Sequence, residues 1–232
     1  GRFRGDGGNG PGYGTIVAGG DNATILHYNR NSRALRDGDL LCVDAGCEYD
    51  FYTADVTRTW PVNGKFSAPQ AQLYGIVLAA QKAAIEQCVP GNTWKDAHDV
   101  ATRVLTRGMV EVGLLECEVE GEIESAVSSL IEAGRQKRYY MHGTGHWLGL
   151  DVHDVGAYNR DGDARPFEPG MVMTIEPGIY IAADNTKVPK RWRGIGVRIE
   201  DDVVVTEQGC EVLTGDVPKR ADEIEALMLQ AS

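Results

Sequence analysis

The sequence predicts an α+β protein in which helices cover one side of a sheet. Strand-like segments occupy residues 15–62, helical periodicity follows over residues 67–133, and strand-like segments return over residues 170–206. Strands and helices that are segregated in this way are typical of the α+β class. A chain of 232 residues with 42% hydrophobic content is long enough for one large domain. No internal boundary is visible, so we expect a single domain over residues 1–232.

Short apolar segments bounded by turn residues predict the first strands. Residues 1–13 are rich in glycine and receive no assignment. The third expected strand stops at Gly46, and the fourth is closed by Pro61 and the turn NG. The four segments are TIVAGG (15–20), ATILHY (23–28), DLLCVDAG (39–46) and TADVTRTWPV (53–62).

Three segments with helical periodicity follow. Ser67 and Pro69 favour a helix start at 67–88, and Thr93 caps a second helix that we expect over 93–113. A third helix is expected over 121–133, with Gly134 after its end. The later elements are two long strands, GMVMTIEPGIYI (170–181) and GIGVRIEDDVVVT (194–206), and a final helix, ADEIEALMLQ (221–230).

Charge and cysteine content exclude several classes of protein. A net charge of −11 argues against a nucleic-acid partner, because binding to phosphates needs a concentrated basic surface. No apolar run approaches the roughly 20 residues that cross a bilayer, so no membrane partner is expected. The five cysteines are scattered without a CxxC pair, so neither a zinc knuckle nor a disulfide framework is indicated. We therefore expect a protein of the reducing cytoplasm.

Four acidic residues interrupt segments that are otherwise strand-like: Asp44, Asp55, Glu176 and Glu200. A buried carboxylate costs several kcal/mol unless a positive group offsets it. Any one of these acids, taken alone, is better explained as a cap or a strand end. Four of them in one small domain, together with a cluster of histidines, favour a shared pair of divalent cations.

The alternation of side chains along a strand supports this hypothesis. Asp55, Thr57 and Thr59 share one face of their expected strand, and Arg198 shares a face with Glu200. Such strands direct acids into a cavity while their other faces pack against helices. An oxygen-rich ligand set with one imidazole suits Mn²⁺ or a similar hard ion better than a thiolate-bound structural zinc. Two such ions, about 3.5–4 Å apart, would lower the pKa of a bridging water.

The segment MHGTGHWLGLDVHDVG (141–156) supplies the histidines, at His142, His146 and His153. Its glycines allow the backbone to approach a neighbour closely. A zincin-type HExxH helix is excluded, because the glutamate is missing and GTG breaks a helix. Composition alone leaves open which of the three histidines is the metal ligand.

Five segments together resemble the catalytic domain of the aminopeptidase P family, bacterial type, within the pita-bread-fold metallopeptidases. The segments are VDAGCEYDFYTADVTRTWPVNGKF, HGTGHWLGLDVHDVG, EPGMVMTIEPGIYI, RGIGVRIEDDVVVT and ILHY. The resemblance extends from about residue 14 to the carboxyl end. It implies a curved antiparallel sheet covered by helices. It also implies that the family's preceding amino-terminal domain and first helices are absent from this sequence.

The resemblance implies a metal site with five ligands: Asp44, Asp55, His146, Glu176 and Glu200. In the family pattern, Asp55 and Glu200 bridge two divalent ions. Asp44 completes one ion, and His146 and Glu176 complete the other. Mn²⁺ is the favoured ion, and Co²⁺ and Zn²⁺ also accept such ligands.

The resemblance also implies a group of residues around the substrate: His27, His142, His153, Tyr180 and Arg198. For Arg198, pairing with a nearby acid to order the site is an equally good alternative. His98 lies on an expected helix, and we interpret it as surface or packing.

The implied reaction is hydrolysis of the bond between an amino-terminal residue and a penultimate proline, with a metal-bridging hydroxide as nucleophile. Glu176 then acts as the proton shuttle and His153 stabilises the oxyanion, while His142 and His27 hold the proline side of the peptide. The partners are thus peptides with proline in second position, and the resemblance implies a homo-oligomer for the intact protein.

Two alternatives remain open. A prolidase, which cuts only Xaa-Pro dipeptides, shares the same five ligands and differs in how the far end of the substrate is closed off. A non-catalytic pita-bread module that binds peptides is disfavoured, because such proteins lose ligands that are all present in this sequence. A two-metal phosphohydrolase would need a phosphate cradle, which the sequence does not contain.

Overall fold

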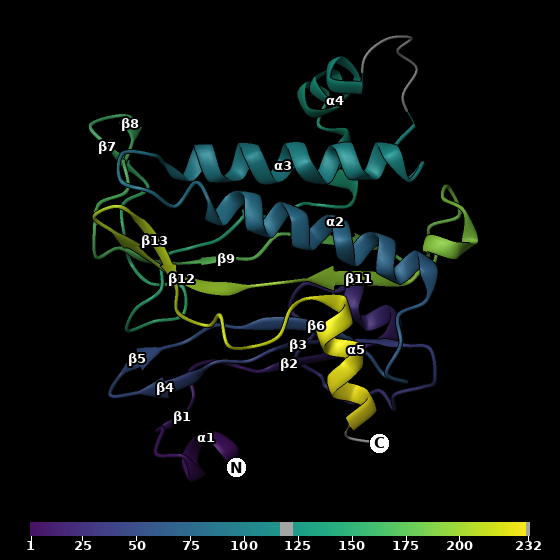
Figure 1. Cartoon of the computed structure of the whole chain (residues 1–232), viewed down its shortest axis with the longest axis horizontal. Coiled ribbons are helices and arrows are strands. Elements are labelled where there is room, and N and C mark those ends of the chain that lie inside the picture. Colours follow the sequence, from purple (N-terminus) through teal and green to yellow (C-terminus); the bar gives the residue numbers. More distant parts are fainter. Residues whose placement is uncertain (117–122, 231–232) are drawn as a thin grey trace.

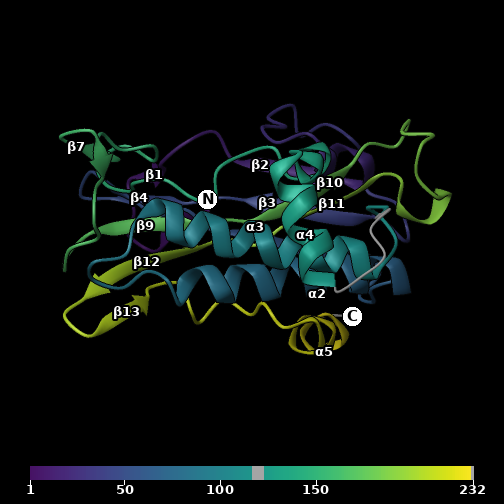
Figure 2. The same cartoon turned by 90° about the horizontal axis from the view of Figure 1, so that it is seen from above.

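Strands and helices separate into layers in the computed structural model, which describes residues 1–116 and 123–230. Helices α2 (Ala68–Ile85) and α3 (Trp94–Glu111) lie side by side over the strands (Figure 1). The view from above shows both helices crossing the same side of the strands, with α4 (Ile123–Glu132) packed on α3 (Figure 2). The predicted α+β class, with helices covering one side of the strands, is confirmed.

Reciprocal hydrogen bonds explain where the two long helices begin. The Ser67 backbone amide donates to Oε1 of Gln70 at 2.8 Å, and the Thr93 backbone amide donates to Oδ2 of Asp96 at 2.8 Å. In each case the cap side chain also accepts a bond from the helix backbone, which completes a capping box. Both helix starts therefore agree with the caps expected from the sequence.

The predicted helices match the observed ones, with ends that differ by a few residues. The helices expected at 67–88 and 93–113 are α2 and α3, and the one expected at 221–230 is α5 (Ala221–Gln230). The helix expected over 121–133 is α4 from Ile123 onward, and its first two residues lie outside the part of the chain that the structure describes.

Three predicted strands in the first part of the chain form one antiparallel sheet. Its order is β2 (Ile16–Gly19), β3 (Leu40–Asp44), β6 (Thr57–Pro61). Asp44 ends the central strand, opposite Ile16 on one side and Thr57 on the other. The other short elements are α1 (Arg2–Gly5), β1 (Gly10–Pro11), β4 (Cys47–Tyr49), β5 (Tyr52–Thr53), η2 (Arg135–Arg138), β7 (Asn159–Arg160), β8 (Asp163–Ala164) and η3 (Lys190–Trp192).

The strand predicted at 23–28 is wrong. This part of the chain contains the end of a 3₁₀ helix, η1 (Gly20–Thr24), and continues as irregular chain. The Ile25 amide donates to the Asn22 carbonyl at 2.9 Å, so the backbone bonds within its own turn instead of to a neighbouring strand. Ile25 is 51% exposed, so this apolar run does not mark a buried strand.

Two further segments differ from expectation. Asp55 lies before its strand and not within it, because β6 begins at Thr57. Residues 1–13, which receive no assignment from the sequence, contain α1 and β1, and β1 pairs with β4 in a second small sheet of order β1-β4-β5. The glycine-rich start is therefore attached to the fold by backbone pairing.

Each of the two long strands predicted near the carboxyl end is split in two. The four pieces are β9 (Val172–Ile175), β10 (Gly178–Ile181), β11 (Ile195–Arg198) and β12 (Asp201–Thr206). β10 pairs with β11, and β9 pairs with β12, whose other edge carries β13 (Gly209–Val212). Pro177, which has no amide proton to donate, lies in the first break. The breaks leave Glu176 and Glu200 outside the strands, between the two paired halves.

Side-chain alternation around the second break separates core from cavity. Val197 and Ile199 are fully buried in the main apolar core with Leu73 of α2. Arg198 and Glu200 line a cavity instead. The predicted alternation is thus confirmed at this strand. Among the described residues, no helix is long and apolar enough to span a bilayer.

We predict that Gly196→Ala destabilises the protein by about 1–3 kcal/mol, because the added methyl group overpacks a closed contact. A Cβ at Gly196 would lie 2.1 Å from the Ala23 carbonyl oxygen, where β11 packs against η1. Urea unfolding measures the change. Gly209→Ala is the control, since its Cβ would meet no atom within 4 Å. Equal stability of the two variants would contradict the proposed contact.

Candidate metal centre

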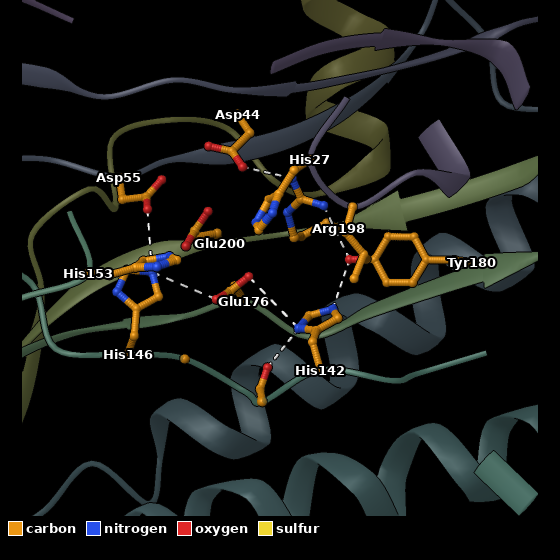
Figure 3. Close-up of a pocket in the computed structure, with 13 residues that line it drawn as sticks. His27, Asp44, Asp55, His142, His146, His153, Glu176, Tyr180, Arg198 and Glu200 are labelled. Carbon is orange, nitrogen blue, oxygen red and sulfur yellow. Dashed lines mark hydrogen bonds and ion pairs between the residues drawn. The ribbon is translucent and has the colours of Figure 1, made fainter. Parts of the chain in front are cut away.

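One open cavity of about 260 Å³ lies where the breaks in the carboxyl-terminal strands meet the end of β3 (Figure 3). Residues far apart in the sequence line it together. The lining includes every site residue expected from the sequence: His27, Asp44, Asp55, His142, His146, His153, Glu176, Tyr180, Arg198 and Glu200.

The four acids reach this cavity from strand ends and not from strand interiors. Asp44 is the last residue of β3, and Asp55 lies just before β6. Glu176 and Glu200 lie at the two strand breaks. Asp44, Asp55 and Glu200 are buried, and Glu176 is partly buried. Ending or breaking a strand frees a side chain from the alternation of the pleat, so all four carboxylates can face one space.

The donor atoms of Asp55, His146 and Glu200 are close enough to share a metal ion. One ligand atom from each lies within 4.8 Å of those of the other two. Nε2 of His146 is 3.5 Å from Oδ2 of Asp55 and 3.8 Å from Oε1 of Glu176. Oxygen donors with a single imidazole nitrogen form the kind of set that holds Mn²⁺ or Zn²⁺.

The orientation of His146 is fixed by its own segment. Its Nδ1 lies 2.9 Å from the Trp147 carbonyl, and a carbonyl can only accept, so Nδ1 carries the proton. Nε2 is therefore the nitrogen that faces the acids, and it can bind a metal ion when it carries no proton. The segment runs against β9, where the Thr174 amide donates to the His146 carbonyl at 2.9 Å. A Cβ at Gly145 would lie 1.8 Å from the Thr174 carbonyl oxygen, which explains the glycine before this histidine.

A chain of hydrogen bonds links the opposite wall of the cavity. Arg198, only 4% exposed, donates from Nη2 to Oδ2 of Asp44 at 2.7 Å and from Nη1 to the Tyr180 hydroxyl at 3.3 Å. The Tyr180 hydroxyl in turn lies 2.9 Å from Nε2 of His142, whose Nδ1 lies 2.7 Å from the Gly143 carbonyl. Because that carbonyl only accepts, Nε2 of His142 accepts from Tyr180. Arg198 thus makes the acid pairing that was one of its two predicted roles.

The remaining histidines differ in their distance from the acids. The ring of His153 lies 4.2 Å from that of His146, and the ring of His27 lies 6.5 Å from that of His153. Both His27 and His153 are exposed at the cavity mouth. His98 does not line this cavity, and its Nδ1 lies 2.9 Å from Oγ1 of Thr144. Its interpretation as a packing residue is consistent with this contact.

Three residues that support the acids were not predicted as site residues. Tyr13 donates to the carboxylates of Asp44 and Asp55, and its hydroxyl lies 2.5 Å from Oδ1 of Asp55. Thr57 donates from Oγ1 to Glu200 at 2.6 Å. Asp202 accepts the Asp55 backbone amide with both carboxylate oxygens, at 3.1 and 3.3 Å. The strand pattern places Thr57 on the face of Asp55, but no pattern in the sequence points to Tyr13 or Asp202.

Burial and mutual repulsion dominate the electrostatics of the acids. Burial raises the pKa of Asp44 above its usual value, although Arg198 beside it opposes the rise. Burial, with Asp55 and Asp44 nearby, raises the pKa of Glu176 to about 7, against the effect of Arg198 and His146. The pKa of Glu200 is raised well above normal by burial and by its carboxylate neighbours. Such a group must take up protons or bind cations at neutral pH.

The pKa values of the two inner histidines are shifted in opposite directions. Burial lowers the pKa of His142 to about 4, so this ring is neutral at pH 7. Burial also acts to lower the pKa of His146, but its contacts with Asp55, the Trp147 carbonyl and Glu176 together outweigh burial and raise that pKa. In Asp55 burial is likewise outweighed by contacts with His146 and Tyr13, which lower its pKa. Asp55 and His146 thus each favour the charged form of the other.

Comparisons with known proteins agree with this geometry. A profile of metallopeptidase family M24 matches residues 1–207. The chain is 54% identical over 218 residues to the Xaa-Pro aminopeptidase of Haemophilus influenzae, covering 94% of this chain and 48% of that protein. It is 48% identical over 221 residues to the Xaa-Pro aminopeptidase of Escherichia coli, covering 95% of this chain and 48% of that protein.

Solved structures show the same similarity. The structure of the Pseudomonas aeruginosa aminopeptidase PepP superposes with a TM-score of 0.93 at 57% identity, covering 99% of this chain and 50% of that one. A zinc-substituted E. coli aminopeptidase P in complex with product has a TM-score of 0.91 at 47% identity, with the same coverage of 99% and 50%. The chain therefore spans about half the length of the curated relatives it matches.

We predict that the metal-free protein loses stability as the pH rises from about 6.5 to about 8. The pKa values of Glu176, Glu200 and His146 are raised by folding, so the folded chain binds more protons than the unfolded chain in this range. Their stabilising contribution is complete below the unfolded pKa and is lost as the pH passes the folded pKa. His142 does not oppose this loss, because above its unfolded pKa it is neutral in both states.

Thermal unfolding of chelator-treated protein across this pH range measures the effect. Addition of Mn²⁺ should raise the melting temperature more at pH 8 than at pH 6, because the cations replace the lost protons. A melting temperature that rises with pH in the chelated protein would contradict the assignment of raised pKa values.

Proposed function

Because the chain belongs to metallopeptidase family M24, we propose that it is the catalytic part of an Xaa-Pro aminopeptidase, which removes the first residue from peptides with proline in second position. The observation that carries the proposal is the convergence of four carboxylates, the imidazole of His146 and further histidines on one cavity. The names of the relatives support the choice of substrate, since they are Xaa-Pro aminopeptidases.

We propose that five side chains hold two divalent ions, with Mn²⁺ favoured and Co²⁺ or Zn²⁺ as alternatives: Asp44, Asp55, His146, Glu176 and Glu200. Asp55 and Glu200 would serve both ions, Asp44 would serve one ion, and His146 and Glu176 would serve the other. The excess of buried carboxylates over positive groups supports a site of this charge. When bound, the ions lower the pKa of a water molecule and supply hydroxide at neutral pH.

Glu176 is the proposed proton shuttle. A pKa of about 7 is suited to a group that first accepts and then returns a proton near neutral pH. Glu176 receives the proton of the attacking water and passes it to the nitrogen of the proline, which leaves as the free amine. Glu176 lines the open cavity and its side chain is 19% exposed, which gives a peptide access to this carboxylate.

The histidines at the cavity mouth are proposed to hold the substrate. His153 is exposed and close to the acids, so an N–H of its ring can donate to the oxyanion of the tetrahedral intermediate. His27 and His142 flank the proline side. His142 is kept neutral by burial, which lowers its pKa, and Tyr180 fixes the direction of its ring. Arg198 orients Asp44 and Tyr180 by donating a hydrogen bond to each.

The acidity of the site also suits an exopeptidase. A free amino terminus is a cation, and four carboxylates with few positive neighbours attract it into the cavity. We therefore propose that the amino group of the substrate lies beside the acidic ligands, which leaves the second residue over Glu176. A peptide without a free amino terminus lacks this interaction.

We further propose that residues 1–232 form one catalytic domain. Leu40 from the first sheet and Ile224 from the last helix belong to the same apolar core, which supports a single unit. We propose a cytoplasmic location, which the scattered cysteines support, because a reducing compartment keeps thiols unpaired. A homo-oligomer is proposed for the intact protein from the family resemblance, and light scattering tests it.

We predict that chelated protein hydrolyses no peptide and that Mn²⁺ restores cleavage of a tripeptide with proline in second position. Asp55→Ala should abolish the restored activity, whereas Asp184→Ala, at an exposed position, should not. Liquid chromatography of the released amino acid measures both. Cleavage confined to the Xaa-Pro dipeptide would make the protein a prolidase. Failure of the wild type to bind any divalent ion would instead favour a peptide-binding module.

We predict that Glu176→Gln lowers kcat by about 10²–10⁴-fold, because the amide cannot carry the proton. The KM should change little, and the side-chain oxygen still allows bound Mn²⁺ to be detected by elemental analysis. Glu168→Gln, an exposed residue that pairs with Arg160, serves as the matched control. Retention of wild-type kcat by Glu176→Gln would assign the proton transfer to another group.

A further inference from the structure

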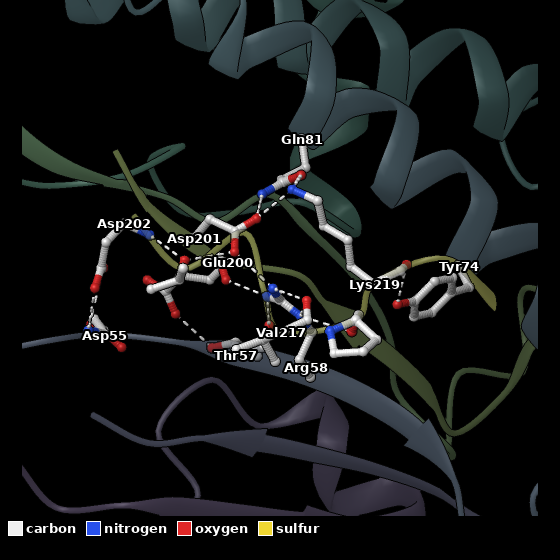
Figure 4. A network of polar contacts seen from close by, with 12 residues as sticks. Asp55, Thr57, Arg58, Tyr74, Gln81, Glu200, Asp201, Asp202, Val217 and Lys219 are labelled. Atoms are coloured by element: carbon white, nitrogen blue, oxygen red, sulfur yellow. Dashed lines mark hydrogen bonds and ion pairs between the residues drawn. The ribbon is translucent and has the colours of Figure 1, made fainter. Parts of the chain in front are cut away.

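A buried arginine lies directly behind the acids of the metal centre (Figure 4). Arg58 on β6 is 2% exposed. Its Nη1 donates to the Glu200 carbonyl at 2.5 Å and to the Thr57 carbonyl at 2.9 Å. Its Nη2 donates to Oδ1 of Asp201 at 2.7 Å and to the Val217 carbonyl at 2.9 Å. One guanidinium therefore holds three separate parts of the chain.

Asp201 is completely buried at the centre of this network. Its Oδ1 accepts from Arg58 and from Oγ1 of Thr214, each at 2.7 Å. Its Oδ2 accepts from Nε2 of Gln81 on α2 at 2.7 Å and from Nζ of Lys219 at 2.5 Å. Two positive groups and four hydrogen bonds more than satisfy the buried carboxylate, and its pKa is lowered even though burial alone raises it.

The network contacts two acids of the metal centre through their backbones. Arg58 fixes the carbonyl of Glu200, whose carboxylate accepts from Thr57 on the cavity side. Asp202, next to Asp201, accepts the backbone amide of Asp55. The consecutive acids Glu200, Asp201 and Asp202 thus have three different partners. Only the first faces the cavity, while the other two tie the peptide backbone of the site to the rest of the fold.

Stability alone is a weak explanation for this arrangement. A buried ion pair costs about as much in desolvation as it returns in attraction, and replacing one by apolar residues is often neutral or better. A planar guanidinium with several donors instead fixes distances among its acceptors, which a point charge cannot do. The acceptors here include the backbone of Glu200 and the segment 214–219, which crosses behind it.

We propose that Arg58 and Asp201 are positioning residues that set the backbone of Glu200 and, through Asp202, that of Asp55. The inference rests on the proposed two-metal site. It makes residues 214–219 part of the support of the metal centre, although none of them lines the cavity. Partners behind the ligands commonly change metal affinity or activity by about 10–100-fold when they are replaced.

Arg58→Lys is the decisive variant, because it retains the charge opposite Asp201 but removes the fork that also holds the Glu200 carbonyl. We expect it to fold and to bind Mn²⁺ about 10-fold or more weakly by calorimetry. The visible absorption of the Co²⁺-loaded protein should change as well, because that spectrum reports the geometry of the ligands. Arg33→Lys is the matched control, since Arg33 pairs with Asp39 at the other end of β3 from Asp44.

A folded Arg58→Lys protein with wild-type Mn²⁺ affinity and an unchanged Co²⁺ spectrum would overturn the proposal, as would an equal loss in Arg33→Lys. If Arg58→Lys does not fold, Thr214→Val replaces it, because Thr214 bonds both the Asp201 carboxylate and the Asp202 amide from a half-buried loop. This variant should weaken Mn²⁺ binding less than the loss of a ligand, and unchanged binding overturns the proposal.

The two proposals fail in distinguishable ways. A wild-type protein that binds no divalent ion removes the two-metal site itself, and the variants then have nothing to position. A wild type that binds metal, with variants that differ from it only in melting temperature, leaves the proposed function intact and shows that the network acts on folding stability alone.

Discussion

Repulsion among four carboxylates in one partly buried cavity is the constraint on which the rest of this structure depends. No ordinary strand places them together, so each is freed by a strand end or a break. The positive charge from Arg198 and His146 is too small to neutralise the four carboxylates, so the site favours the binding of cations. The helices cover the opposite face of β10 and β11, where alternate residues are apolar. One face of these strands thus buries apolar side chains, and the other carries the charged side chains of the cavity.

Periodicity predicted most of this fold because it reports burial on one side of an element. The periodicity failed to predict strand ends where an apolar segment continues but pairs with a different strand. The two long carboxyl-terminal segments are apolar on both sides of Glu176 and of the charged stretch 198–202, so each was predicted as one continuous strand. Pro177 was the local sign of the first break. The apolar run at 23–28 misled for another reason, since Ile25 is exposed and the backbone there forms a tight turn.

The candidate site was more predictable than its support. Acidic residues within apolar segments are easy to recognise in a sequence, because a buried carboxylate requires a positive group or a cation nearby. Tyr13 and Arg58 do not, since a tyrosine beside glycines and an arginine in a strand have many ordinary explanations. Asp201 and Asp202 look equivalent in the sequence, and only the fold shows that one accepts cationic side chains while the other accepts a backbone amide. Such roles depend on which distant segment of the chain packs beside the residue. Local sequence patterns do not contain that information.

The run of three acids at the second break also constrains how this protein can evolve. Neighbouring side chains project in different directions. Inserting or deleting one residue between Arg198 and Asp202 would therefore place a different side chain opposite each of the present partners. A single replacement there disturbs the contacts of one side chain, whereas a change in length disturbs those of every side chain in the stretch. Lineages descended from a common ancestor should therefore vary freely in loop length elsewhere, yet keep the residue count of this short stretch fixed.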